Sequence, residues 1–203
     1  MPVLGITGGV ATGKSSLTRC LRQWLSARVF DADAIARELL ESDTNVKQTV
    51  LEVFGSEVID SGGGGDVVDR GRLREVVFRD SEKRRKLEAI LHPLIRIRWM
   101  EMAKIFRNNP DWLLVDIPLL FETSAESEFD IVAVVACSEV TQRSRIVSER
   151  RLSVEMADRI IAAQQSLASK MARAGHVIWN DSPPAQLEQQ AQIFAGYLRE
   201  RYG

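Results

Sequence analysis

Cysteine is scarce in this chain, which has 2 cysteines among 203 residues, Cys20 and Cys137. They lie far apart and outside any Cys-x-x-Cys spacing, so the sequence indicates neither a disulfide framework nor a zinc site, and it fits a reducing compartment. An excess of one charge is also missing, because 27 basic residues nearly balance 28 acidic ones. We therefore expect no nucleic-acid or membrane partner, and any anion site must be built locally.

Long apolar runs are missing as well. The longest stretches, residues 112–121 and 131–137, are too short to cross a bilayer, and the first residues lack the basic flank and apolar run of a signal peptide. We expect a cytoplasmic protein, as a monomer, although the sequence leaves an oligomer open. With 45% hydrophobic residues, the chain can bury the core of one compact α/β domain with insertions.

Short apolar runs alternate with stretches of helical spacing. Strands are expected at residues 3–7, 112–116, 131–135 and 176–179, and one more strand is expected to end near residues 29–30. Helices are expected at residues 14–25, 73–106, 139–173 and 186–202. One further helix is expected to start at residues 34–40, and another to end at residues 51–54. Pro93 is expected to divide the stretch 73–106 into two or more helices. The alternation predicts a three-layer α/β/α fold with a parallel five-stranded sheet.

A glycine-rich segment separates the second strand from the later helices. Residues 61–66 include four consecutive glycines, from Gly62 to Gly65. Such a run loses too much conformational entropy to lie inside a helix or strand, so it predicts a flexible loop.

The segment between the first strand and the first helix matches the pattern G-x-x-x-x-G-K-[ST]. It comprises Gly8, Gly9, Val10, Ala11, Thr12, Gly13, Lys14 and Ser15, and Ser16 follows it. Glycines let the backbone curl so that its N–H groups surround an anion, and the next helix adds its positive N-terminus. Lys14 would contact the β- and γ-phosphates, and the Ser15 hydroxyl would bind Mg²⁺. The motif predicts a P-loop NTPase fold that binds ATP and Mg²⁺.

The loop alone leaves the fate of the phosphate open, because kinases, GTPases and other ATPases share it. A GTPase-type switch would need an Asn-Lys-x-Asp motif, and the sequence has none. A kinase that phosphorylates a nucleoside or nucleotide stays an alternative at this point.

Further segments resemble the dephospho-coenzyme A kinase family, in the family's order. They are residues 29–37, the Leu-His-Pro run at 91–95, the Asp-x-Pro-Leu-Leu run at 116–122, and Gln142, Arg145, Arg159 and Gln164. The matches extend from residue 3 to about residue 180. The resemblance implies transfer of the γ-phosphoryl group of ATP to the ribose 3′-hydroxyl of dephospho-coenzyme A.

The resemblance also implies a layout of three parts. The nucleotide-binding core would comprise residues 1–60, 111–138 and 174–203. A helical acceptor-binding subdomain would span about 61–110, and a small lid about 139–173.

Two acids follow the second strand, Asp31 and Asp33. On an extended chain their side chains project to one side, at the sheet edge where open α/β sheets bind ligands. Kinases need a carboxylate to accept or orient the proton of the acceptor hydroxyl, and the resemblance favours Asp33 as this base. The alternative is that Asp33 caps a helix beginning at Ala34. Asp31 would assist the metal or order the loop.

Basic residues gather in the expected lid. The resemblance identifies Arg145 as the arginine that meets the charge developing on the transferred phosphate. Arg143 and Arg151 fit a solvated helix face better. Where the family has a second arginine, this chain has Glu149, and the adjacent Arg150 is the candidate substitute.

Four further residues are candidate ligands. His92 would contact the acceptor or be structural, and Glu122 would lie on the substrate side. Asp116 ends a strand, as a metal-binding acid does, although it could instead hydrogen-bond the loop. Asn180 follows the last strand, where an adenine could rest. The family's aspartate before this strand is replaced here by Gly175, so that no role carries over to it.

Overall fold

A parallel sheet of five strands, in the order β2-β3-β1-β4-β5, organises the fold of the computed structural model, which describes residues 1–59 and 68–203. The strands are β1 (Val3–Gly8), β2 (Ala27–Asp31), β3 (Trp112–Asp116), β4 (Ile131–Ala136) and β5 (His176–Trp179). Each neighbouring pair is parallel, so the carboxyl ends of all five strands meet at one edge. The predicted α/β fold with its parallel sheet is confirmed.

An α-helix follows every strand except β3, which leads to β4 through a short 3-10 turn at Glu126–Glu128. The helices are α1 (Lys14–Trp24), α2 (Ala32–Ser42), α3 (Thr44–Phe54), α4 (Arg70–Arg79), α5 (Ser81–Phe106), α6 (Glu139–Arg150), α7 (Val154–Ala162), α8 (Leu167–Arg173) and α9 (Pro184–Tyr202). Short polar side chains start several of them, because a side-chain oxygen accepts from backbone N–H groups that have no helical partner. Ser138 accepts in this way from Thr141 N, and Ser166 from Ser169 N.

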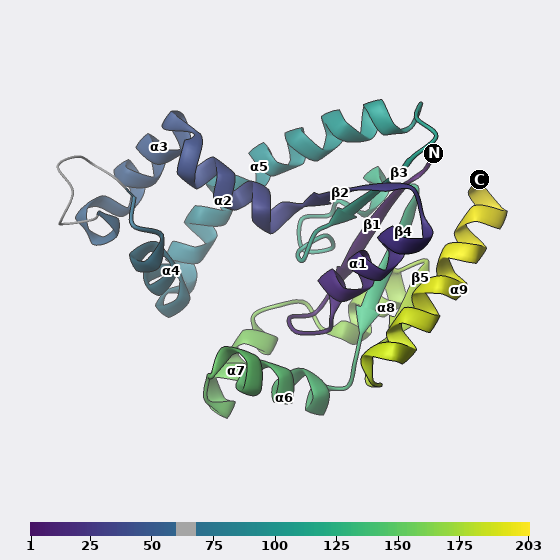
Figure 1. Ribbon diagram of the computed structural model, residues 1–203. Coiled ribbons are helices and arrows are strands. Elements are labelled where there is room, and N and C mark those ends of the chain that lie inside the picture. Colours follow the sequence, from purple (N-terminus) through teal and green to yellow (C-terminus); the bar gives the residue numbers. More distant parts are fainter. Residues whose placement is uncertain (60–67) are drawn as a thin grey trace. The chain divides into compact units, whose positions relative to one another are not determined.

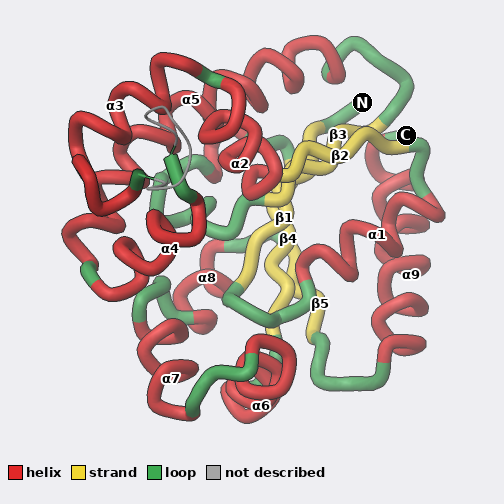
Figure 2. Tube along the Cα trace, turned by 60° about the vertical axis from the view of Figure 1, so that its left-hand side comes forward, coloured by secondary structure: helices red, strands yellow, loops and turns green. Residues whose placement is uncertain are grey.

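The sheet is covered on both faces. Figure 2 shows α1 and α9 on one side of the sheet and α8 on the other. On the α1 and α9 side, one continuous core joins strand residues such as Leu4 and Ile6 to Leu17 and Leu21 of α1 and to Leu198 of α9. These side chains are fully buried, which makes this layer a rigid support for the loop that precedes α1.

The chain divides into two compact units. One comprises Met1–Asp31 and Glu101–Gly203 and holds the sheet, and the other comprises Ala32–Met100 and is helical. Within the helical unit, α2, α3, α4 and the first part of α5 share a core that includes Leu39, Val50 and Leu91 (Figure 1). The helical unit therefore begins at Ala32, not near residue 61 as expected, because α2 and α3 bury their apolar faces against α4 and α5.

The expected break at Pro93 is wrong, since α5 runs through it. The break lies instead at Asp80, whose Oδ1 accepts from Glu82 N at 2.8 Å and Lys83 N at 3.2 Å and so starts α5. Pro93 deprives the carbonyl of Ala89 of a helical donor. Both residues are exposed, so water can hydrate that carbonyl and the helix continues.

The predicted glycine loop at 61–66 lies outside the described residues. Among the described helices, none is both long and apolar enough to cross a membrane.

Candidate active site

The glycine-rich loop leaves the carboxyl end of β1 and enters α1, as predicted. Gly8, Gly9 and Val10 are buried. Gly13 is the N-cap of α1 and has a φ of 95°, in the left-handed region that favours glycine. A Cβ at Gly13 would also lie 2.3 Å from Nδ2 of Asn180, so any side chain there would displace the loop or that amide.

Side chains bind the carbonyl groups of the first half of the loop. The Gly8 carbonyl accepts from Lys170 Nζ at 3.3 Å. The Gly9 carbonyl accepts from Thr12 Oγ1 at 2.9 Å, within the loop itself. The Val10 carbonyl accepts from Gln142 Nε2 at 2.8 Å.

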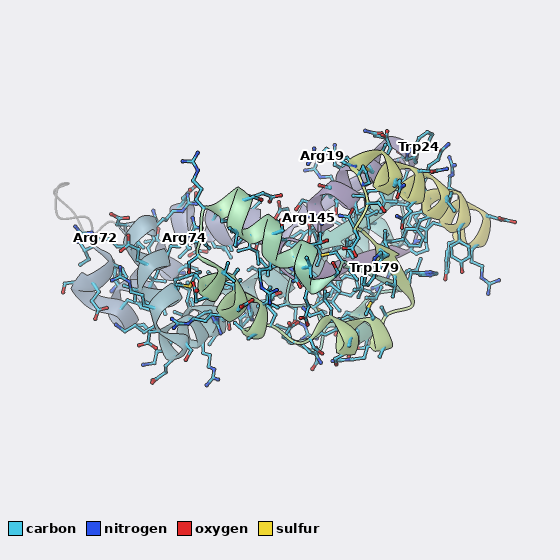
Figure 3. The ribbon with its side chains drawn as sticks, turned by 90° about the horizontal axis from the view of Figure 1, so that it is seen from below. Arg19, Trp24, Arg72, Arg74, Arg145 and Trp179 are labelled. Carbon is cyan, nitrogen blue, oxygen red and sulfur yellow. The ribbon has the colours of Figure 1, made fainter. Side chains whose placement is uncertain are left out.

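The second half of the loop is held in the same way by two residues from distant segments. Nη1 of Arg145 donates to the carbonyls of Ala11 at 3.3 Å and Thr12 at 3.4 Å. Nδ2 of Asn180 donates to the Thr12 carbonyl at 2.8 Å, and the backbone carbonyl of Asn180 accepts from Arg145 Nη2 at 2.9 Å. Arg145 lies on α6 and Asn180 directly follows Trp179, which Figure 3 labels together with Arg145.

These bonds determine where the N–H groups of the loop point. In a trans peptide the N–H points away from the C=O, so a loop carbonyl that is held by a distant side chain turns the next N–H away from that side chain. The N–H of Val10 donates to Gln164 Oε1 at 2.9 Å. Together with the N-terminus of α1, the loop has the geometry of an anion nest.

Two acids lie beside the loop at the sheet edge. Asp31 and Asp116 are register partners at the ends of β2 and β3, and Asp116 also pairs with Ile6 of β1. Asp116 is 8% exposed, whereas Ser15, in the first turn of α1, is exposed. Among residues 1–59 and 68–203, no group of three or more His, Cys, Asp or Glu side chains could hold a metal by itself.

A buried ion pair lies behind the loop. Nζ of Lys170, on α8, is 2.8 Å from Glu122 Oε1, and the Lys170 side chain is 0% exposed. The same oxygen of Glu122 accepts from Gln165 N at 3.0 Å. The structure therefore gives Glu122 protein partners, and its expected contact with the substrate stays a prediction.

A family model described as dephospho-CoA kinase matches residues 2–186. A dephospho-CoA kinase of Bacillus cereus is 38% identical over 192 residues, which cover 94% of this chain and 94% of that protein. The chain belongs to the dephospho-CoA kinase family.

Solved structures share the fold of this chain. The TT1252 protein of Thermus thermophilus has 31% sequence identity and a TM-score of 0.77, covering 100% of this chain and 98% of that chain. A dephospho-CoA kinase from Campylobacter jejuni has 23% identity and a TM-score of 0.71, covering 98% of this chain and 97% of that chain, and it supports the fold.

The residue expected to be the base of a dephospho-CoA kinase, Asp33, has a different local setting from the one predicted. β2 ends at Asp31 and α2 begins at Ala32, so Asp33 lies in the first turn of α2 and not on an extended strand end. For the same reason it does not cap a helix that begins at Ala34. Asp33 is exposed, and its carboxylate is favoured there by the positive end of the helix.

Two further candidates of the family site also contact the protein itself. The guanidinium of Arg145 binds loop carbonyls, and its expected contact with a phosphate stays a prediction. The side-chain amide of Asn180 donates to the Thr12 carbonyl. The expected contact of Asn180 with the adenine of ATP stays a prediction. Arg143 pairs with Asp158 at 2.6 Å and so links α6 to α7. Arg150 is the last residue of α6.

His92, the remaining candidate of the dephospho-CoA kinase site, lies inside α5 and is half-buried. Burial lowers the pKa of His92 below its usual value, and the Glu88 carboxylate opposes the shift. Burial also lowers the pKa of His176, the other histidine of the chain.

These pKa shifts predict how stability depends on pH. Each histidine has an ordinary pKa near 6.5 when unfolded and a lower pKa when folded, so the unfolded chain binds more protons as the pH falls through about 6.5. The free energy of unfolding, measured by urea denaturation, is therefore expected to decrease from pH 7.5 to pH 5.5. The double variant H92Q/H176Q should lose less over the same range, and an unchanged slope would contradict the assignment.

Sequence analysis missed the role of Lys170 altogether and assigned no contacts to Gln142 and Gln164. A lysine in a short polar helix has no local signal for burial, because lysine is almost always exposed. Gln142 and Gln164 did stand out as parts of the resemblance, but their spacing gives no indication that they bind the two polar groups of one residue, Val10.

Proposed function

We propose that this chain transfers the γ-phosphoryl group of ATP to the 3′-hydroxyl of the ribose of dephospho-CoA, which gives CoA and ADP in the last step of CoA biosynthesis. The observation that carries the proposal is the loop in which distant side chains hold four carbonyls, those of Gly8, Val10, Ala11 and Thr12. This geometry supports a triphosphate site, and family membership supports the acceptor.

In this proposal, different groups of the loop and its surroundings contact different parts of the triphosphate of ATP. The backbone N–H groups of the curl and the N-terminus of α1 would bind phosphate oxygens. Lys14, whose Nζ lies 3.4 Å from the Gly9 carbonyl, would move to the β- and γ-phosphates and stabilise the charge that develops on them. Arg145 would add a second cation after it leaves the loop carbonyls.

The donor set fits a magnesium ion. The exposed hydroxyl of Ser15 and the carboxylate of Asp116 are hard oxygen ligands of the kind that Mg²⁺ prefers, and Mg²⁺ keeps several waters besides. When bound, the ion would neutralise charge on the β- and γ-phosphates. Asp31, the register partner of Asp116, would order this edge or assist through water.

The helical unit is the proposed acceptor-binding part, and the segment from α6 to α8 is the proposed lid. Asp33, exposed at the start of α2, would accept the proton of the attacking 3′-hydroxyl. His92, kept neutral by its lowered pKa, would contact the acceptor as a hydrogen-bonding group without transferring a proton. We propose further that the protein is cytoplasmic and that it is a monomer. Sedimentation analysis tests its oligomeric state.

A competition assay tests the function. The purified protein is incubated with Mg-ATP and either dephospho-CoA, adenosine or AMP, and ADP and the phosphorylated product are both quantified. We expect formation of CoA with dephospho-CoA only. Preference for adenosine or AMP would indicate a nucleoside or nucleotide kinase, and ATP turnover that no acceptor changes would indicate a regulatory NTPase.

A further inference from the structure

We infer that Lys170 is a positioning residue of the phosphate site, which it serves by fixing the first peptide of the loop against the segment that follows Asp116. The inference rests on the proposed function, because it assigns the loop to ATP. Lys170 itself does not touch the nucleotide in this arrangement. Its ammonium group acts through the backbone atoms that it holds.

The burial of Lys170 requires a reason. Its side chain is 0% exposed, and lysine is almost never fully buried unless its charge is paired. An ammonium group has three donors. Here three acceptors surround it: the carbonyl of Gly8 at 3.3 Å, the carbonyl of Pro118 at 3.2 Å and Oε1 of Glu122 at 2.8 Å. The group is thus fully satisfied, and two of its three partners are backbone carbonyls.

The three acceptors come from functionally different segments. Gly8 is the last residue of β1 and the first of the loop, while Pro118 stands two positions after Asp116, the candidate metal ligand. The Pro118 carbonyl also accepts from Thr7 Oγ1 at 3.2 Å. One ammonium group therefore ties the start of the phosphate loop to the segment that leaves Asp116.

The bond to Gly8 also sets the direction of the next peptide. Because the Gly8 carbonyl points at Lys170, the N–H of Gly9 in the same plane points the opposite way. The Gly8 site is tightly enclosed, since a Cβ there would lie 2.3 Å from the Val135 carbonyl. A change in the direction of this peptide would therefore be passed on along the loop.

The alternative is that Lys170 only neutralises Glu122, whose side chain is 23% exposed. The two roles differ in what the removal of both charges would do. If Lys170 serves Glu122 alone, the double variant K170M/E122Q leaves no unpaired charge and should recover both stability and activity. If Lys170 positions the loop, the double variant removes the unpaired charge and regains part of the stability, but the Gly8 carbonyl loses its donor, while the Pro118 carbonyl keeps Thr7 Oγ1. The glutamine keeps an oxygen for Gln165 N.

The experiment compares wild type, K170M, K170M/E122Q and K104M, which removes an exposed lysine of α5 in the same compact unit. Thermal unfolding, the Kd of Mg-ATP by calorimetry without acceptor, and kcat and KM for dephospho-CoA are measured. We expect the double variant to unfold at a higher temperature than K170M, to bind Mg-ATP about tenfold more weakly than wild type, and to lose about tenfold in kcat. KM for dephospho-CoA should stay unchanged, as should every parameter of K104M.

The outcomes separate this inference from the proposed function. A folded double variant that binds Mg-ATP and turns over like wild type would overturn the positioning role, as would an equal loss in K104M. If K170M does not fold, the double variant carries the test alone, and its failure to fold would contradict the prediction. If wild type makes no CoA, the proposed function fails, yet the calorimetric comparison still decides the role of Lys170.

Discussion

The variant Lys14→Ala is expected to lose on the order of 10²-fold or more in kcat/KM for phosphoryl transfer, because a preorganised charge that meets the transition state is removed. Lys14 is the first residue of α1 and follows the curl directly, so its cation is placed by the backbone rather than by a mobile loop. The effect should appear mainly in kcat. Steady-state kinetics with saturating Mg-ATP and dephospho-CoA measure it.

Arg19→Ala is the matched control for this prediction. Arg19 is an exposed cation of the same helix, labelled in Figure 3, and its loss should leave both kcat and KM as in wild type. Thermal unfolding of both variants shows whether either change affects folding. If Lys14→Ala retains the turnover of wild type, the loop does not bind the transferred phosphate and the proposed site is wrong.

The phosphate loop could be predicted from the sequence because its signals are local. An apolar strand, a glycine curl and an amphipathic helix follow one another within residues 3–25, and the structure has the same three elements in β1, the loop and α1. The parallel sheet could be predicted for a related reason. Runs such as Ile131–Ala136 are apolar on both faces, and only a covered sheet buries both.

The supports of the loop could not be predicted, because they depend on contacts between distant segments. Asn180 binds Thr12 across 168 positions, and Lys170 binds Gly8 across 162. Whether such a side chain reaches the loop depends on how α8 and β5 pack on the core. For the same reason the contacts of Arg145 and Glu122 with the protein itself could not be predicted, and their contacts with phosphate and substrate stay predictions.

The boundaries of the helical unit were missed for a different physical reason. The residues from 32 to 54 have ordinary helical spacing, which indicates an apolar face but not what that face packs against. Here it packs with α4 and α5 in one core, so the unit begins at Ala32. Pro93 shows the limit of local reasoning too, since one lost helical bond at an exposed position did not end α5.

The variant Asp33→Asn is expected to bind Mg-ATP as wild type does but to lose on the order of 10²- to 10⁴-fold in kcat, because an amide cannot accept the proton of the acceptor hydroxyl. Asp33 lies in the first turn of α2, two positions after the end of β2. Its carboxylate also interacts favourably with the helix N-terminus, and asparagine loses that interaction. Calorimetric binding of Mg-ATP, kcat for CoA formation and thermal unfolding are measured on the same preparation.

Two variants that each remove one negative charge from α2 are compared to decide the role of Asp33. Glu38→Gln removes an exposed carboxylate of the same helix outside its first turn, so it should leave kcat and Mg-ATP binding unchanged. A helix-terminal role for Asp33 costs only about 0.3–1 kcal/mol of stability, which a folded enzyme tolerates without loss of turnover. Near-normal kcat in a folded Asp33→Asn protein would therefore refute the base and leave only the helix interaction. A large loss of kcat with intact Mg-ATP binding has no such structural explanation, because the affected step is the one that needs the proton acceptor.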